Sequence, residues 1–540
     1  MKKFLSLVLA LAMLLAMAAP VLAEETPTVS YYVRGGTAEY EPYIYPGLVG
    51  LLKIQQMANV NIDWTVVCGS GDEIQAQYLA MLASGNYPDI IQWQHNNSYV
   101  GGVSQLYKDG IIIELNDVID KYMPNYKKLL EENPHVAKTL MDEEGRYLYF
   151  TVINPLNSDL EKVAVTWWGL MMRQDWLDNV GATVPTTIDE WYEVLTLFKE
   201  GDPNGNGESD EIPFDAGSLG INLFMPAFGF QSGMYIDPET GKVAYGQYTE
   251  NFKSFLETMN KWYAEGLIGN VFADELGNPT ESADSNIFAD LAGSWKGLSN
   301  YWEQRLPQVL EKNPNADFVA VPWPISESGV AYADNYGMGY GDRYSTCISV
   351  DCKNVEAAAR LIDQMYTEEG TNCTTWGTIE GDPINPEWTN GHGTYTIDEN
   401  GVKHETEWAN QMTENFYDGA FANKYRYAMS HVSFPRWGAA DYLAATREPR
   451  YVDSAMLWAS ASNALEYPAA ITLSTDAQKA VAPESENMGA YINEMTYKFI
   501  TGVEPLTNYD NYLAQLEKMG IKELINLYQE AYDSFNARGN

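Results

Sequence analysis

The residues whose types and spacing are best suited to a chemical role lie in the stretch 202–211. Its sequence is Asp-Pro-Asn-Gly-Asn-Gly-Glu-Ser-Asp-Glu, so that oxygen-bearing side chains recur on alternate residues between glycines. Calcium takes six to eight oxygen ligands, and a tightly turning loop of this composition can supply them. We therefore predict a structural Ca²⁺ site whose ligands come from Asp202, Asn204, Asn206, Glu208 (through its carbonyl), Asp210 and Glu211.

The loop departs from a true EF-hand at its closing position. Gly207 stands where an EF-hand loop makes its sharp turn, but the twelfth position, where a bidentate glutamate closes the site, is Pro213. Glu211 is the expected closing carboxylate. The simpler alternative is an Asn-Gly turn that holds no metal. The pattern leaves no position open for a substrate, so we expect a structural site rather than a catalytic one.

The segments on either side of the loop indicate a helix before it and a strand after it. Thr187 to Glu190 forms a capping box, and apolar residues follow at helical spacing at Trp191, Val194, Leu195 and Phe198. Ile212-Pro213-Phe214 is expected to be extended, because proline disfavours helix in the residue before it. A bound cation would therefore join a helix to a strand.

The N-terminus has the pattern of a secretory signal peptide. Met-Lys-Lys precedes an apolar run from Phe4 to Ala19, and a small-residue site ends at Ala23, so we expect residues 1–23 to be removed. No cysteine precedes Cys68, so the mature N-terminus lacks a lipid-anchored cysteine. No later stretch is apolar over the roughly 20 residues that a membrane helix needs. We expect an exported protein, periplasmic or extracellular, that is not inserted in a membrane.

Composition narrows the class of partner. The formal net charge is −41, which argues against nucleic acid and anionic membranes and, more weakly, against polyanionic ligands such as a uronate polymer. Aromatic residues make up 13% of the chain, including 15 tryptophans and 37 tyrosines. Aromatic rings stack on the apolar faces of sugars while their polar edges stay hydrated. The composition therefore favours carbohydrate contact.

The four cysteines and five histidines point to no metal or redox centre. The cysteines, at positions 68, 347, 352 and 373, allow three full pairings. Cys347 and Cys352 are close enough in sequence for a disulfide, and this pairing is left open. No cysteine or histidine spacing matches a zinc site.

The first part of the mature chain predicts a parallel sheet. Segments with strand and helix patterns alternate at 28–33, 48–57, 60–66, 74–82 and 88–91. Ligands of such sheets bind at the carboxyl ends of the strands. This places Arg34, Trp93, Gln94 and His95 at a candidate cleft.

Later segments continue the mixture of helices and strands. We expect a hairpin over 142–152 and helices over 252–263, 355–366, 491–500 and 512–535, with Glu368-Glu369-Gly370 ending the helix over 355–366. Strands are expected over 163–170, 287–291 and 318–321. The strand over 287–291 would run into a loop, 292–297, that carries Trp295.

Several segments together resemble the extracellular solute-binding proteins of ABC transporters, in the group that captures oligosaccharides. The calcium loop at its distance after Val-Pro-Thr-Thr is the most specific of them, and the likeness extends over nearly the whole mature chain. The segments are 82–91, 173–176, 184–187 with the loop, 369–370, 376–377, 380–381 and 499–502.

The resemblance implies an α/β fold of the periplasmic-binding-protein type, class II, with two α/β lobes joined by a hinge that the chain crosses more than once. One lobe would comprise 24–152 and 329–384, and the other 153–328 and 385–540. Such lobes close on a ligand by hinge motion. The implied function is binding without chemistry, with an oligosaccharide ligand and a membrane permease as partners. We expect a monomer.

The resemblance and the placement at strand ends together nominate the residues that contact a sugar. Trp295 matches the position at which relatives stack a sugar ring, with packing on the lobe surface as the alternative. The full set of ligand-binding candidates is Trp295, Trp168, Trp376, Trp93, Gln94, Arg34, Tyr336 and Trp437. Trp167 is an alternative to its neighbour Trp168, while Asp342, Arg343 and Arg436 carry weaker support.

Two other functions stay open from the sequence. A glycoside hydrolase needs two carboxylates that flank the scissile bond, roughly 5–9.5 Å apart, but 74 acidic residues always supply a pair, so such pairs carry no information. A binding protein for peptides or other solutes would share the fold and the aromatic cleft.

Overall fold

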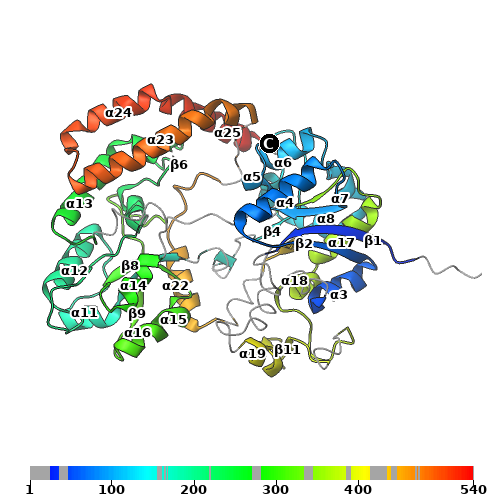
Figure 1. Cartoon of the computed structure of the whole chain (residues 1–540), viewed down its shortest axis with the longest axis horizontal. Coiled ribbons are helices and arrows are strands. Elements are labelled where there is room, and N and C mark those ends of the chain that lie inside the picture. The colour runs from blue at the N-terminus through cyan, green and yellow to red at the C-terminus, as the bar shows by residue number, and fades with distance from the viewer. Residues whose placement is uncertain are drawn as a thin grey trace, which may run out of the picture.

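The computed structural model describes most of the chain outside its first 24 residues. The described residues are 25–35, 47–154, 158, 161–162, 166, 168–217, 220–269, 281–333, 345–384, 391–413, 434–438, 445, 447–468, 471, 473 and 475–538. The signal peptide predicted over 1–23 and the candidate Tyr336 therefore lie outside them. Two groups of elements, each built around its own sheet, lie beside one another (Figure 1).

The first lobe is built on a four-stranded sheet with the order β10-β3-β1-β2. The central β1 (Thr28–Arg34) pairs in parallel with β2 (Asn61–Val67) and β3 (Ile90–Trp93), as the alternation of strands and helices predicted. The edge strand β10 (Ser345–Ile348) is antiparallel to β3 and was not expected from the sequence.

Both faces of this sheet are buried, as in other parallel sheets. Tyr31 and Val33 of β1 point into one core and Tyr32 into another. On the first face lie α3 (Val49–Ala58), α7 (Asn116–Tyr122), α8 (Pro124–Glu132), α9 (Pro134–Leu140) and α17 (Val355–Met365), and on the second face α4 (Gly71–Ala83) and α6 (Gly102–Lys108). The helices expected over 48–57, 74–82 and 355–366 are confirmed.

Residues 368–370 begin a helix rather than end one. Thr367 accepts a hydrogen bond from the N–H of Gly370 at 2.9 Å and so caps the N-terminus of α18 (Glu368–Thr375). Gly370 has no room for a side chain, because a Cβ there would lie 1.8 Å from the carbonyl oxygen of Gln364. The glycine thus allows α18 to begin directly after α17. The sequence pattern alone predicts instead that these residues end a helix.

The second lobe is built on the antiparallel sheet β8-β5-β9. Its strands are β5 (Trp168–Arg173), β8 (Ser294–Leu298) and β9 (Phe318–Val321). One aromatic-rich core joins the sheet to the helices around it. These include α11 (Gln174–Val180), α12 (Ile188–Glu200), η2 (Gly220–Phe228), α13 (Glu250–Ala264), α14 (Glu281–Phe288), α15 (Tyr301–Gln304), α16 (Leu306–Lys312) and α22 (Pro449–Ala459).

Two sequence predictions fail in this sheet. The strand expected over 287–291 is instead the end of α14 and a turn, and the loop expected over 292–297 is mostly β8. Gly293 and Gly297 suggested a loop, but they are present for packing, because a Cβ at Gly297 would lie 2.0 Å from the sulfur of Met171. In addition, β5 extends to Arg173, beyond the predicted end at Leu170.

The C-terminal helices α23 (Thr475–Thr501), α24 (Tyr509–Lys518) and α25 (Ile521–Ala537) cover one side of the second lobe (Figure 1). Gly520, with φ of +89°, interrupts the helix that was expected to run over 512–535. The last turn of α25 also reaches the first lobe. There Arg538 donates to the carbonyl of Met141 at 2.8 Å, and Lys138 of α9 donates to the carbonyl of Asn536 at 3.2 Å.

Two short parallel strands lie where the chain passes between the lobes. They are β4 (Val152–Ile153), which ends a first-lobe segment, and β13 (Arg436–Trp437). Near the predicted return to the first lobe, Tyr332 and Ala333 still pack in the second core, whereas β10 belongs to the first sheet. The predicted lobe boundaries at 152, 329 and 384 stay a prediction.

The remaining strands form hairpins outside the two main sheets. These are β6 (Met234–Ile236) with β7 (Val243–Tyr245), and β11 (Tyr395–Ile397) with β12 (Lys403–Glu405), the latter followed by α19 (Glu407–Thr413). Of the hairpin expected over 142–152, the structure shows a single bridge between Met141 and Tyr147, while Phe150 bridges Thr346 and Val152 pairs with β13 instead. None of the four cysteines, all of which lie in the described part of the chain, forms a disulfide, so the open question of a Cys347–Cys352 disulfide is answered in the negative. Among the described helices, none combines the length and the apolarity needed to cross a membrane.

Candidate functional site

The predicted calcium loop folds around its own acidic and amide side chains. The carboxylate of Asp202 accepts hydrogen bonds from the backbone N–H groups of Asn206 and Gly207, each at 3.1 Å. Asn206 accepts from the N–H of Glu208 at 2.7 Å and donates to Asp210 at 3.0 Å. Gly205 and Gly207 have positive φ angles of +69° and +82°, which glycine adopts without strain. The loop therefore turns tightly, as predicted.

Glu211 is the residue of this loop that most needs a partner. Its side chain is buried, and its Oε1 atom has no hydrogen-bond partner among the described residues. Burial, and then the nearby charges of Asp210 and Asp202, raise the pKa of its carboxyl group. A buried carboxylate beside two others is stabilised by a cation. The donor set therefore fits Ca²⁺.

The carboxylates of this loop do not form a metal cluster by themselves. No group of three or more His, Cys, Asp or Glu side chains in the described part of the chain is arranged to hold a metal ion. The predicted set draws half of its oxygens from two asparagines and a carbonyl, which suit Ca²⁺ as well as carboxylates do. Whether the loop binds calcium stays a prediction.

The segments that flank the loop have the predicted structure. Thr187 caps α12 by accepting from the N–H of Glu190 at 3.2 Å, although the Glu190 carboxylate accepts its short bonds from Thr186 rather than from Thr187. After the loop, Ile212 is extended and bridges Ala292, and the N–H of Asp215 donates to Ser294 at 2.8 Å. The loop thus joins a helix to the edge of the second-lobe sheet.

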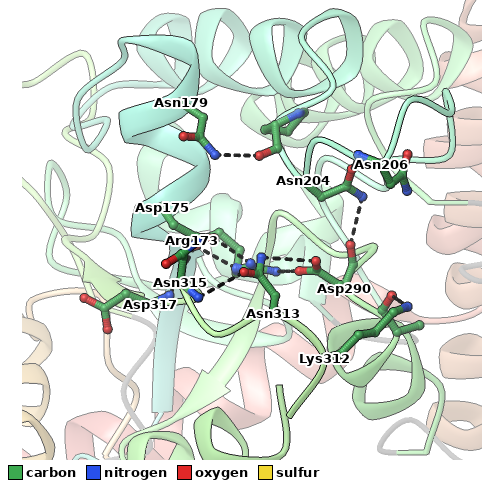
Figure 2. A network of polar contacts seen from close by, with 12 residues as sticks. Arg173, Asp175, Asn179, Asn204, Asn206, Asp290, Lys312, Asn313, Asn315 and Asp317 are labelled. Atoms are coloured by element: carbon green, nitrogen blue, oxygen red, sulfur yellow. Dashed lines mark hydrogen bonds and ion pairs between the residues drawn. The ribbon is translucent and has the colours of Figure 1, made fainter. Parts of the chain in front are cut away.

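A buried ionic network lies directly under the loop (Figure 2). Arg173, which is 1% exposed, donates to both carboxylate oxygens of Asp175, at 2.8 and 2.6 Å, and pairs with Asp290. The carbonyl of Asp290 accepts from the side chain of Asn204 in the loop at 3.0 Å. Asn179 donates to the carbonyl of Pro203 at 2.7 Å. The loop is therefore tied directly to the C-terminal end of α11 and, through Asp290, to Arg173 at the end of β5.

The first-lobe candidates meet at the ends of their strands, as predicted. Arg34 ends β1 and donates to the side chain of Gln94, just after β3, at 2.7 Å, and both residues are half-buried. Trp93 is different. Its ring is 1% exposed and stacks on Tyr78 with the centroids 4.7 Å apart, inside the core of that face. The placement of Arg34 and Gln94 suits ligand contact, whereas Trp93 offers no free ring face.

Trp295 lies in the hydrophobic core and not at a surface. It is the second residue of β8, is fully buried, and packs edge-on against Phe318 with the ring centroids 5.0 Å apart. The prediction that its ring stacks on a sugar finds no support here. The error follows from the misplaced strand, because side chains of a strand alternate between its faces and this one faces inward.

Trp168 is the tryptophan of the second-lobe sheet that retains exposure. Its neighbour Gly169 faces Trp458 of α22, so Trp168 points to the opposite side of β5. The ammonium group of Lys296 on β8 lies 3.2 Å from the centre of its ring. The sequence analysis did not consider Lys296. Leu298 on β8 is the strand partner of Trp168, and Lys296 lies two residues before it. This proximity is evident only once the register of β5 and β8 is known.

The remaining candidates are scattered. Trp376 follows α18, is 2% exposed and packs on Tyr395. Trp437 of β13 is half-buried and packs on the first-lobe core, while its neighbour Arg436 is 8% exposed. Tyr336, Asp342, Arg343 and Trp167 lie outside the described residues. Among the candidates that the structure describes, it brings Arg34 and Gln94 together in a hydrogen bond and buries Trp93, Trp295 and Trp376 in cores.

Residues 53–372 match the family model for bacterial extracellular solute-binding proteins. The chain is 27% identical over 509 residues to the fructooligosaccharide ABC transporter substrate-binding protein FusA of Streptococcus pneumoniae serotype 4, a match that covers 91% of this chain and 87% of FusA.

The solved structures with the same fold include the FusA complex with kestose, with a TM-score of 0.69, 23% identity and coverage of 94% of this chain and 99% of FusA. An EF-hand mutant of FusA bound to fructo-nystose gives a TM-score of 0.69 at 22% identity, with the same coverage. An extracellular solute-binding protein of Bifidobacterium longum subsp. infantis gives a TM-score of 0.72 at 19% identity, covering 95% and 99%.

Proposed function

The chain belongs to the family of bacterial extracellular solute-binding proteins, and we propose that it captures an oligosaccharide and delivers it to the membrane permease of an ABC importer. The similarity to FusA, which covers most of both chains, supports this proposal. The family acts outside the cytoplasmic membrane, in agreement with an exported protein. We also propose that residues 1–23 are a cleaved signal peptide and that the protein acts as a monomer.

The observation that carries the sugar proposal is the arrangement of Trp168. A half-buried indole ring on a rigid strand, with a cationic donor on the next strand, combines the two elements of sugar recognition: a face for stacking and a donor for hydroxyl groups. Arg34 and Gln94 supply further polar groups on the other lobe. A ligand held between the lobes would contact both sets.

We propose that the ligand is released intact. The family consists of binding proteins, and the leading candidates at the site are aromatic, amide and cationic groups rather than a pair of carboxylates. Glycoside hydrolysis needs such a pair at a defined separation. Product analysis of the ligand after incubation decides this point.

We further propose that Ca²⁺ binds the loop 202–211 as a structural ion. The oxygens of Asp202, Asn204, Asn206 and Asp210, with the carbonyl of Glu208 and the carboxylate of Glu211, would hold it. The buried, unpartnered Oε1 atom of Glu211 supports this assignment. The ion would offset two of the three negative charges of Asp202, Asp210 and Glu211 in a loop that joins α12 to the second-lobe sheet.

The test is calorimetry and tryptophan fluorescence of the mature protein with kestose, nystose, maltotriose and short peptides. Saturable binding of a sugar that is recovered intact supports the proposal. Trp168→Ala should then weaken binding of that sugar by about 1–3 kcal/mol, because a desolvated ring face is lost. Trp64→Ala, on the edge strand β2, is the matched control and should leave binding unchanged.

The outcomes separate the alternatives. Binding of peptides without sugars would replace the ligand class, and a cleaved sugar would indicate an enzyme. Equal loss of binding in the Trp168 and Trp64 variants would remove Trp168 from the site. Trp295→Ala should instead destabilise the fold, by about 3–5 kcal/mol, because it opens a cavity in the core.

A further inference from the structure

Arg436 is a buried cation that has no carboxylate group beside it among the residues that the structure describes. Its side chain lies on β13, is 8% exposed, and its Nε atom has no hydrogen-bond partner among the described residues. The side-chain hydrogen bond that it makes there is a long one, 3.4 Å, from Nη1 to the carbonyl of Thr374. No Asp or Glu oxygen in the described part of the chain lies within 4.0 Å of its guanidinium group.

A second deeply buried arginine, at the end of β5 in the second-lobe sheet, shows how this molecule compensates a buried guanidinium group. Arg173 is 1% exposed and is flanked by Asp175 and Asp290. A buried charge is costly unless it is paired, so proteins rarely leave one unpaired. Around Arg436, by contrast, the buried polar neighbours are the uncharged Thr151 and Thr374. Burial accordingly lowers the pKa of Arg436 to about 10.

The position of Arg436 between the lobes indicates that a bound ligand is its charge partner. β13 pairs with β4, which ends the first-lobe segment from which the chain continues to β5 of the second lobe. Residues on this strand pair therefore lie at the passage between the lobes, where the proposed function places the ligand. The following residue, Trp437, adds a half-buried aromatic ring on the same strand.

We propose that Arg436 is a ligand-binding residue that pairs with a carboxylate group of the captured solute, which makes an acidic oligosaccharide the ligand class. This inference rests on the proposed function for the location of the ligand. A carboxylate matches the planar guanidinium group and neutralises it, whereas hydroxyl groups leave the buried charge in place. The net charge of −41 is compatible with a single carboxylate, because charges beyond about 8 Å are largely screened at physiological salt.

A structural alternative is that Arg436 stabilises the C-terminal end of α18. Its Nη1 atom contacts a carbonyl in the last turn of that helix, where cations interact favourably with the helix dipole. In that case neutral and acidic ligands would be affected alike by its replacement. The experiment therefore compares each acidic ligand with its own neutral ester.

The probes are trigalacturonate, trimannuronate, sialyllactose and citrate, each measured by calorimetry beside its methyl ester. We expect the wild-type protein to bind at least one acid at least tenfold more tightly than the ester. Arg436→Gln should abolish this preference, and Arg436→Lys should retain part of it. Arg450→Gln, which removes a half-exposed arginine paired with Glu448 and Asp317, is the matched control and should keep it.

Two results overturn the inference: no preference for any acid in the wild-type protein, or a preference that survives in Arg436→Gln. The acid–ester comparison in the wild-type protein stands even if Arg436→Gln does not fold. Binding of kestose alone would support the proposed function and overturn this inference. Binding of citrate alone, lost in Arg436→Gln, would support the pairing of Arg436 with a ligand carboxylate but would overturn the oligosaccharide class together with the proposed sugar function.

Discussion

The two lobes bury ionisable groups in different ways. In the first lobe, His95 is fully buried, its Nδ1 lies 2.6 Å from the hydroxyl of Tyr78, and burial lowers its pKa to about 4, so that it is neutral. In the second lobe, the buried Arg173 stays compensated by Asp175 and Asp290. At neutral pH the first lobe thus buries His95 as a neutral ring and surrounds the buried side chain of Asp363 with N–H donors of Asn125 and Tyr126, whereas the second lobe buries a network of ion pairs.

The difference follows from what each sheet must hold. The parallel sheet of the first lobe is covered by helices on both faces and is closed by apolar packing. The second lobe must also fix a polar loop against the end of a strand, which apolar contacts cannot do. Its ionic network and the predicted cation supply directional contacts at that place. The comparison suggests that the second lobe is the more sensitive to charge removal, and four experiments test it.

The largest effect is expected from Arg173→Met. The substitution leaves Asp175 and Asp290 buried without their cation, which costs about 3–5 kcal/mol in the free energy of unfolding. Urea unfolding followed by tryptophan fluorescence measures this loss. The first-lobe control is Arg360→Met, which removes a partly exposed pair with Glu356 and should cost under about 1 kcal/mol. Equal losses would contradict the comparison.

The next effect is the response of the first lobe to acid. Because the folded pKa of His95 is about 4, below its usual value near 6.5, the unfolded chain binds the extra proton first as the pH falls. The free energy of unfolding should therefore fall by up to about 3 kcal/mol between pH 6.5 and pH 4. Urea unfolding at half-unit steps measures the slope, and His95→Gln should reduce it. An unchanged slope would show that another group dominates.

Calcium removal should lower the stability of the second lobe by a comparable amount. The size of this loss depends on the free Ca²⁺ concentration before chelation. At a free Ca²⁺ concentration of 100 times its Kd, binding adds about 2.7 kcal/mol to stability, so chelation should lower the melting temperature. Ligand affinity should persist, because the ion lies in the scaffold. Differential scanning fluorimetry with and without chelator measures the shift.

Two variants sharpen the calcium experiment. Glu211→Gln removes the buried carboxylate and should abolish the response, whereas Glu208→Gln, which leaves the expected carbonyl ligand in place, should preserve it. Lost ligand binding with an unchanged melting temperature would contradict a structural role for the ion.

The smallest effect is expected from Glu466 of the second lobe, whose pKa burial raises to about 7. The folded state then holds the proton more tightly than the unfolded chain, so stability falls as the pH rises from about 4.5 to 7 and is constant above that range. Glu466→Gln should raise the free energy of unfolding by about 1–2 kcal/mol at pH 8 and leave it unchanged at pH 4. A stabilisation that is equal at both values would rule out titration as its cause.

The same contrast explains how far the sequence predicted each lobe. In the first lobe, helix and strand periods alternate along the chain, so a parallel sheet could be predicted from local pattern, whereas the central place of β1 between β2 and β3 could not. The edge strand β10 could not, since it returns to β3 from more than 250 residues away and no local pattern links the two.

In the second lobe, the local signals were weaker and sometimes misleading. The loop 202–211 was predictable because its residues are contiguous, but the partner of Arg173 lies 117 residues away at Asp290. The prediction that Trp295 lies at a surface followed from placing it in a loop after a strand and from its match to the position where relatives stack a sugar, whereas Gly293 and Gly297 in fact admit bulky neighbours within the sheet. Contacts between strands decide which face a tryptophan occupies, and these contacts are not written in the local sequence.

The helix α25 restricts how the two lobes can rotate relative to one another. Gln529 accepts from the backbone of Val243 in the second lobe, while Arg538, just beyond the end of the helix, donates to Met141 in the first. A helix of this length is stiff, so these two anchors keep a nearly fixed separation. A rotation that preserves both contacts must have its pivot beside Met141. A reporter fused after Asn540 would therefore travel with the axis of the motion and would register little of its amplitude.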